Sequence, residues 1–276
     1  MPVPSVAERG YANPNLLADT DWLAEHLKDP NLRLIDTRSG DLYSAGHIPG
    51  AISLNAFGGI PRAGNNDMGT AAQFEQLAGT MGIANDSTVV IYDAPGAQMG
   101  MTAWAFLMNG HADVHVLDGG FQKWTAEDRP VTTDTVISRA STTYKASRVD
   151  AMDCPLDYAK SAVGKEGVVF WDTRALAEHE GTQGNNPRMG HITGSNHLEW
   201  TDLLDADTKT LKPGDELRAM LTSRGITPES EVNTYCQGGG RAATAAFVLK
   251  VLGYDRVRNY TGSFGQWSRQ DDTPIE

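Results

Sequence analysis

The stretch LRLIDTRSGDLYSAGHIPGA at residues 32–51 is echoed later in this chain of 276 residues, and the echo decides the fold. The counterpart of its first half is VVFWDTRALAEHE at 168–180, and the counterpart of its second half is RMGHITGS at 188–195. A strand-like run ending in Asp-Thr-Arg, followed by a Gly-His-Ile turn, therefore occurs twice. Self-similarity at a long period indicates duplication of a whole structural unit.

Two further pairs of segments continue the repeat in the same order. They are VVIYDAPGAQMGMTAWAFLMNG (89–110) with EVNTYCQGGGRAATAAFVLKVLG (231–253), and LDGGFQKW (117–124) with YTGSFGQW (260–267). From Asp93 to Gly119 is 26 positions, and from Cys236 to Gly262 is also 26. Asp93 and Cys236 therefore occupy the same place in two copies of one domain. The second copy carries a loop insertion around GTQGNNPR.

Short apolar runs alternate with helix-like stretches in each copy. Such strands, apolar along their whole length and separated by helices, are typical of a parallel sheet covered on both faces. The predicted fold class is α/β, with two tandem domains. We expect the domains at 1–130 and 151–276, joined by a Ser/Thr-rich linker at 131–150. The expected strands lie near 32–35, 89–92, 114–117, 168–171, 231–235 and 257–260.

Composition narrows the classes of function. An apolar content of 40% suffices for two cores, and the net charge of −12 disfavours nonspecific binding to nucleic acid or to anionic membranes. The N-terminus lacks the pattern of an export signal, and no window approaches the roughly 18 apolar residues of a spanning helix. Two cysteines are too few for a stapled secreted scaffold. The sequence favours a reducing cytoplasm.

Cys236 lies at the turn between a predicted strand, EVNTY, and a predicted helix that ends at Gly253. The carboxyl ends of parallel strands and the loops after them carry the sites of such folds. Gly238, Gly239 and Gly240 allow positive φ and close approach of a ligand. The N–H groups of residues 237–242 converge on one point at the positive end of the helix dipole. That dipole and Arg241 favour a nucleophilic thiolate, so the loop predicts a cradle for an anion on sulfur.

The chain resembles the two-domain rhodanese family of thiosulfate and 3-mercaptopyruvate sulfurtransferases over nearly its whole length. YSAGHIPGAISL at 43–54 matches the amino-terminal signature of the family, and YTGSFGQW is similar to the carboxyl-terminal one, with Gln266 where glutamate is usual. The family pattern of Asp in the first domain and Cys in the second is repeated as Asp93 and Cys236. The resemblance implies an inactive first domain and a persulfide on Cys236. It also implies that neither cofactor nor metal is needed.

The partners implied are a small anionic sulfur donor and a cyanide, thiol or protein acceptor. The loop CQGGGR is similar to that of bacterial thiosulfate enzymes, so thiosulfate is the expected donor and 3-mercaptopyruvate the alternative. A noncatalytic persulfide carrier that binds a partner also stays open. The expected binding residues are Gln237, Gly238, Gly239, Gly240, Arg241, Ala242 and Arg188. Glu178 stands where vertebrate-type enzymes of the family have a substrate-binding arginine.

Other conspicuous residues favour structural roles. Those that recur in both copies are expected to form ion pairs or to order turns: Asp36, Arg38, Asp172, Arg174, His47 and His191. The spacing of His111 and His115 lacks helical register, so we expect no metal there. Cys154 has no activating neighbour in the sequence. Cysteine phosphatases place their arginine six positions after the cysteine, whereas Arg241 is five positions on, and we expect no phosphatase activity.

Overall fold

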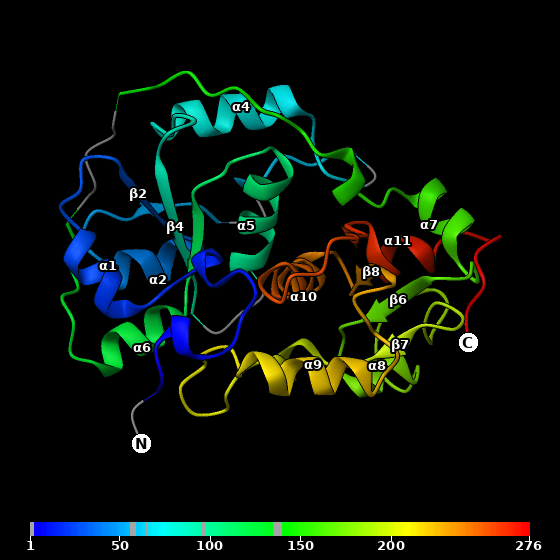
Figure 1. Cartoon of the computed structure of the whole chain (residues 1–276). Coiled ribbons are helices and arrows are strands. Elements are labelled where there is room, and N and C mark those ends of the chain that lie inside the picture. Colours follow the sequence, from blue (N-terminus) through cyan, green and yellow to red (C-terminus); the bar gives the residue numbers. More distant parts are fainter. Residues whose placement is uncertain (1–2, 56–58, 65, 95–97, 135–139) are drawn as a thin grey trace.

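Among the described residues, every pair of hydrogen-bonded strands is parallel, and the strands fall into two sheets. The computed structural model describes residues 3–55, 59–64, 66–94, 98–134 and 140–276 (Figure 1). Each sheet belongs to one copy of the repeat. The predicted class, two tandem α/β domains with parallel sheets, is confirmed.

The first sheet has the strand order β1-β5-β4-β2-β3. Its strands are β1 (Leu17–Ala18), β2 (Leu32–Asp36), β3 (Ile52–Ser53), β4 (Thr88–Tyr92) and β5 (Val114–Leu117). The helices around it are α1 (Thr20–His26), α2 (Gly40–Ala45), α4 (Ala71–Thr80), α5 (Gln98–Met108) and α6 (Gly120–Ala126). Two short 3₁₀ turns, Val6–Glu8 and Pro14–Leu16, precede the first strand.

The second sheet has the order β7-β6-β8-β9. Its strands are β6 (Val168–Asp172), β7 (Asn196–His197), β8 (Glu231–Tyr235) and β9 (Val257–Asn259). The helices are α7 (Leu156–Ala162), α8 (Leu176–His179), α9 (Gly214–Thr222), α10 (Gly240–Val251) and α11 (Ser263–Trp267), with 3₁₀ turns at Asp150–Met152 and Trp200–Leu203. All six predicted strands are confirmed to within one residue at either end.

Both faces of the first sheet are buried, which explains why apolar residues occupy neighbouring positions along its strands. Leu34 and Val90 face a core shared with Trp124 of α6, whereas Ile35 and Ile91 face the core that contains Phe74 of α4. Successive strand residues point to opposite faces of a sheet, so each strand must be apolar on both sides when helices cover both. The second sheet is covered in the same way by two separate groups of helices.

The two domains meet through α5 and α10, the helices that follow the Asp93 and Cys236 loops. These helices lie side by side between the two sheets (Figure 1), and a single apolar core continues across them. A Cβ on Gly100 of α5 would lie 2.3 Å from Oγ1 of Thr244 of α10, so the two helices touch at their backbones. Equivalent helices therefore form the domain interface, which gives the molecule an approximate twofold arrangement.

The described part of the expected linker lies against the first domain. Thr142 donates its N–H to the carbonyl of Gly79, Ser147 to that of Asn109 and Val149 to that of Met108. Tyr144 is buried in the core. Residues 135–139 of this segment lie outside the described residues. In the part of the chain that the structure describes, no helix has the length and apolarity needed to cross a bilayer.

Candidate active site

Cys236 lies at the carboxyl end of β8, one of the central strands of the second sheet, and four residues before α10 begins. Its Sγ accepts a hydrogen bond from the N–H of Gly239 at 3.1 Å, and its own N–H donates to Oγ of Ser263 at 3.1 Å. The residue is 2% exposed. The sulfur therefore sits at the N-terminus of a twelve-residue helix, where the helix dipole favours negative charge.

The glycine loop forms the cradle, although not quite in the way the sequence suggested. Of the three glycines, only Gly239 has a positive φ, of 89°, and a Cβ there would lie 2.7 Å from the carbonyl oxygen of Thr261. Gly240 is already the first residue of α10, so Arg241 and Ala242 belong to its first turn. The N–H groups of Gln237 and Gly238 donate to no atom of the described residues. They remain available to an anion at the sulfur.

Arg241 is held by Glu178 of α8. Its two terminal nitrogens donate to the carboxylate at 2.6 and 2.9 Å, so the pair is bidentate. Burial disfavours the charged form of Arg241, but Glu178 and the Cys236 thiolate more than offset it, and its pKa lies above the ordinary value. Burial also opposes ionisation of Glu178, yet Arg241 lowers the pKa of that carboxyl. Much of the charge of Arg241 is thus balanced before any donor arrives.

Arg188 has a different environment from the one expected of a substrate-binding residue. Its guanidinium donates to the carbonyls of Trp267, Ser268, Gln270 and Thr273, all in the last turn of the chain's final helix or in the segment after it. Arg188 therefore fixes the C-terminal segment in place and does not make the anion contact expected of it. The insertion before Arg188 reaches the cradle through Asn186, whose amide exchanges hydrogen bonds of 2.7 and 3.0 Å with that of Gln237.

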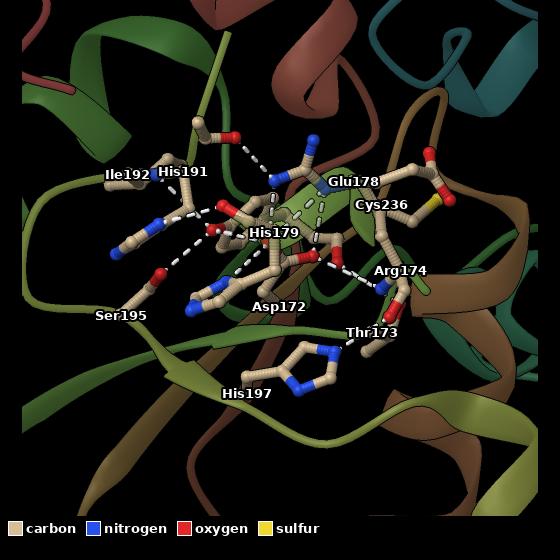
Figure 2. A network of polar contacts seen from close by, with 12 residues as sticks. Asp172, Thr173, Arg174, Glu178, His179, His191, Ile192, Ser195, His197 and Cys236 are labelled. Atoms are coloured by element: carbon tan, nitrogen blue, oxygen red, sulfur yellow. Dashed lines mark hydrogen bonds and ion pairs between the residues drawn. The ribbon is translucent and has the colours of Figure 1, made fainter. Parts of the chain in front are cut away.

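A buried Asp–Arg ion pair lies at the carboxyl end of one strand in each sheet, next to the loop of Asp93 or Cys236. Arg174 binds Asp172 at 2.6 Å and donates to the carbonyl of Gly190, while the hydroxyl of Tyr235 donates to Asp172 at 3.0 Å (Figure 2). The first copy repeats this with Arg38 and Asp36 at 2.6 Å. The structural role expected for these residues is confirmed, because the pair exists in the copy without a cysteine.

Three histidines lie around Asp172 in the second copy, and two of them, His179 and His197, carry no signal in the sequence pattern. His179 binds Asp172 through Nδ1 at 3.0 Å and stacks on His191, with ring centroids 3.7 Å apart. The ring of His197 lies on the side of His179 opposite His191, with the ring centroids of His179 and His197 4.8 Å apart (Figure 2). The first copy has only Tyr43 stacked on His47. Both His47 and His191 bond to a carbonyl of the preceding helix, as expected of residues that order the turn.

The remaining sequence candidates lie away from the cradle. His111 bonds to the carbonyl of Ser87, whereas His115 bonds to Asp113 and to the carbonyl of Asn15, so the two rings have separate partners. No group of metal-binding side chains occurs among the residues that the structure describes. Cys154 is buried, and burial raises the pKa of its thiol well above the usual range. It is therefore a packing cysteine.

Comparison with known proteins agrees with this geometry. The family model for the rhodanese-like domain matches this chain twice, over residues 19–127 and 155–270. The chain belongs to the rhodanese family. Each match contains one Asp-Thr-Arg ion pair and one of the equivalent positions 93 and 236, so the duplication inferred from spacing is a tandem of rhodanese domains.

Rhodaneses of full length are similar to the whole chain. The sulfur carrier protein TtuD of Thermus thermophilus is 35% identical, over 96% of this chain and 98% of its own. A thiosulfate sulfurtransferase of Azotobacter vinelandii is 32% identical over the same shares. Among solved structures, YnjE superposes with a TM-score of 0.87 at 22% identity, covering 96% of this chain and 68% of its own. That likeness shows the shared fold.

Two parts of this rhodanese site could not be named from the sequence. The first is Ser263, which has a φ of 55° and bonds to the backbone of Cys236. Its signal was the change from Gly120 to Ser263 between LDGGF and YTGSF. The second is the contribution of the first domain. A cavity of about 520 Å³ beside the cradle is lined by Gly64 and Asn66 as well as by Gln237, Gly262, Gly265 and Arg269 of the second domain.

Proposed function

We propose that this rhodanese transfers sulfane sulfur from thiosulfate to cyanide or a thiol through a persulfide on Cys236. The thiolate attacks the outer sulfur of thiosulfate, a new S–S bond forms, and the old S–S bond breaks with its electron pair leaving on sulfite. Cyanide then attacks the outer sulfur of the persulfide, and thiocyanate leaves as the thiolate is restored. Neither half-reaction needs a cofactor or a net oxidant.

The observation that carries the proposal is the hydrogen bond from Gly239 N–H to Sγ of Cys236 at 3.1 Å, at the N-terminus of α10. A persulfide anion extends one sulfur atom beyond Sγ and needs donors without bulk. The N–H groups of Gln237 and Gly238, together with the first turn of α10, supply them. Preorganised donors of this kind stabilise developing charge without reorganisation. The proposal assigns the anion to the loop formed by Gln237, Gly238, Gly239, Gly240, Arg241 and Ala242.

Thiosulfate is preferred over 3-mercaptopyruvate because the loop CQGGGR resembles that of bacterial thiosulfate enzymes, and relatives at about 32% identity bear that name. Arg241 is already paired with Glu178, so the backbone N–H donors of the loop, together with a cation from outside it, bind the anion. We further propose the division at 1–130, 131–150 and 151–276, and action in a reducing cytoplasm, where both cysteines stay free thiols as they are here.

The test is the mass of the intact protein and of the Cys236 peptide after incubation with thiosulfate and no acceptor. We expect Cys236 to gain one sulfur atom, and cyanide to remove it with release of thiocyanate. Cys236→Ser should gain none, and Cys154→Ser should behave as the wild type. A parallel sample with 3-mercaptopyruvate compares donors. If 3-mercaptopyruvate adds sulfur to Cys236 and thiosulfate does not, thiosulfate is not the donor. If neither adds sulfur, the proposed sulfurtransferase activity is wrong.

A carrier role is the second candidate, favoured by the 35% identity to a protein named sulfur carrier. It differs in where the sulfur goes. A carrier keeps its persulfide in the presence of cyanide or small thiols and gives it up to a protein. The persulfide lifetime on Cys236 against each acceptor separates the two: loss to cyanide within seconds favours the enzyme, and survival of the persulfide until a protein acceptor is added favours the carrier.

A further inference from the structure

A hairpin of the first domain reaches the walls of the Cys236 cradle. Arg62 and Met68 form an antiparallel bridge, and Gly69 donates its N–H to the carbonyl of Pro61 at 2.8 Å. From this hairpin, Nη1 of Arg62 donates to the carbonyl of Gly238 at 3.1 Å. Nδ2 of Asn66 donates to the carbonyl of Thr261 at 3.2 Å. The hairpin thus contacts both loops that surround the sulfur, the one after β8 and the one after β9.

Within the described ranges, no carboxylate pairs with the guanidinium of Arg62. Nη1 also donates to Oδ1 of Asn66 at 2.9 Å, but Nε and Nη2 are buried and have no hydrogen-bond partner in the part of the chain that the structure describes. No ion pair of Arg62 occurs among those residues. Burial lowers the pKa of Arg62, and the charge that counteracts this is the Cys236 thiolate.

Arg62 is half-buried, and placing two of its guanidinium nitrogens out of water without a partner costs free energy, so the arrangement needs a reason to persist. Buried polar groups left without partners are typical of functional sites. The Cys236 sulfur supplies the reason here. Arg241 also interacts with Cys236, but Glu178 holds it bidentately and balances part of its charge. Arg62 adds to it a positive charge from the other domain that has no carboxylate partner among the described residues.

The first domain's equivalent position also lies beside a hairpin of the other domain. An antiparallel bridge between Leu204 and Leu211 closes that second-domain hairpin, and Leu204 and Lys209 line a small cavity together with Asp93. The amino group of Lys209 donates to the carbonyl of Ala206 in its own hairpin. A basic side chain that donates to the backbone of the loop beside the cavity, as Arg62 does to Gly238, is therefore described at the Cys236 site.

We propose that Arg62 is a positioning residue for sulfur transfer, supplying from the first domain the positive charge that draws an anionic donor to Cys236 and stabilises its persulfide. This rests on the proposed function, in which Cys236 carries the sulfur. It also gives the first domain, which has no cysteine of its own at the equivalent position, a part in the chemistry of the second.

The experiment compares alkylation of Cys236 by iodoacetate, an anion, with alkylation by iodoacetamide, a neutral reagent of similar shape, in the full chain. The ratio of the two rates reports the local charge, because both reagents attack the same thiolate and its abundance cancels. We expect Arg62→Met to lower the ratio about three- to tenfold. Arg62→Lys should keep most of it. Arg129→Gln, which removes a first-domain charge paired with Asp21 and Glu127, is the control for net charge and should change nothing.

Stability separates this role from a structural one. Replacing a half-buried charge that has no carboxylate partner with an apolar side chain of similar length is often neutral or stabilising, so Arg62→Met should unfold at the same temperature as the wild type or higher. Its KM for thiosulfate should rise and its persulfide should be shorter-lived. An unchanged alkylation ratio with a lowered melting temperature would overturn the proposal. The ratio needs no donor, so it tests Arg62 even if thiosulfate fails to load Cys236.

Discussion

The two rhodanese domains share the backbone contacts that flank the positions of Asp93 and Cys236. The carbonyl of Asp93 accepts from Phe121 N–H at 2.8 Å, and that of Cys236 accepts from Phe264 N–H at 2.9 Å. Gly120 and Ser263, which precede these phenylalanines, have φ of 54° and 55°. The ion pairs behind the loops match as well. The scaffold of a sulfur site has therefore been kept where the sulfur is absent.

What differs is the space at the loop and a few side chains. The cavity beside Asp93 is about 10 Å³, and the one beside the Cys236 loop is about 520 Å³. The first copy has Gly120 and Tyr43 where the second has Ser263 and His179. The comparison indicates that the sheet and its ion pair place the residue at position 93 or 236, whereas the cavity and the donors around the loop differ between the two copies.

The largest effect on sulfur transfer should come from removing the cysteine at position 236 and placing one at position 93. Cys236→Ser should lower sulfur transfer by at least about a thousandfold, as expected for loss of a nucleophile. Adding Asp93→Cys to it should restore nothing, because a cavity of about 10 Å³ admits no thiosulfate. Peptide-resolved mass after thiosulfate treatment checks both. A persulfide on the new cysteine would show that the nucleophile alone separates the two copies.

A smaller effect is expected at Ser263. Its positive φ is strained for any residue with a Cβ, while its hydroxyl satisfies the buried N–H of Cys236. Ser263→Gly and Ser263→Ala both lose that bond, but only glycine relieves the strain. We therefore expect Ser263→Gly to be more stable than Ser263→Ala by about 1 kcal/mol in urea unfolding. Equal stabilities, or a more stable alanine variant, would contradict the strain at this position.

The smallest effect concerns acid stability. Burial opposes ionisation of Asp172, but the hydrogen bonds from His179 and Arg174 hold the pKa of its carboxyl at about 2. A carboxyl whose pKa is lowered by folding stabilises the protein above its unfolded pKa, near 3.8, and loses that contribution as the pH falls towards 2. His179→Tyr, which copies the first domain, should move acid unfolding to higher pH by about half a unit.

Circular dichroism during acid titration measures that shift. His26→Tyr, a substitution in the first domain that leaves Asp172 untouched, is the control. If both variants unfold at the same pH as the wild type, His179 contributes nothing to the ionised form of Asp172, and the histidine cluster does not distinguish the two copies in acid.

The sequence predicted the fold well because the repeat fixes register. Equal spacings from Asp93 to Gly119 and from Cys236 to Gly262 aligned the two copies, and uninterrupted apolar runs identified the buried strands. The three two-residue strands were not predicted, because two residues carry no periodic pattern; they are Leu17–Ala18, Ile52–Ser53 and Asn196–His197.

The site was predictable only along the chain. The loop at Cys236 is local, so its glycines and helix start could be recognised. Arg62 lies more than 170 positions from Gly238, and contacts between domains leave no trace in local spacing. Arg188 shows the opposite failure. A basic residue near the GHI turn suggested an anion contact, but carbonyls at the far end of the chain satisfy it.

The contact between α5 and α10 also bears on how the protein is made. On the ribosome, α5 is complete about 140 residues before α10. At roughly 5 to 20 residues per second, the apolar surface of α5 that packs on α10 waits uncovered for about 7 to 30 s. Gly100 leaves that surface flat at the point where Thr244 will dock. Uncovered apolar surface promotes aggregation of a nascent chain, so slower translation of the second domain would lengthen the interval in which this surface is exposed.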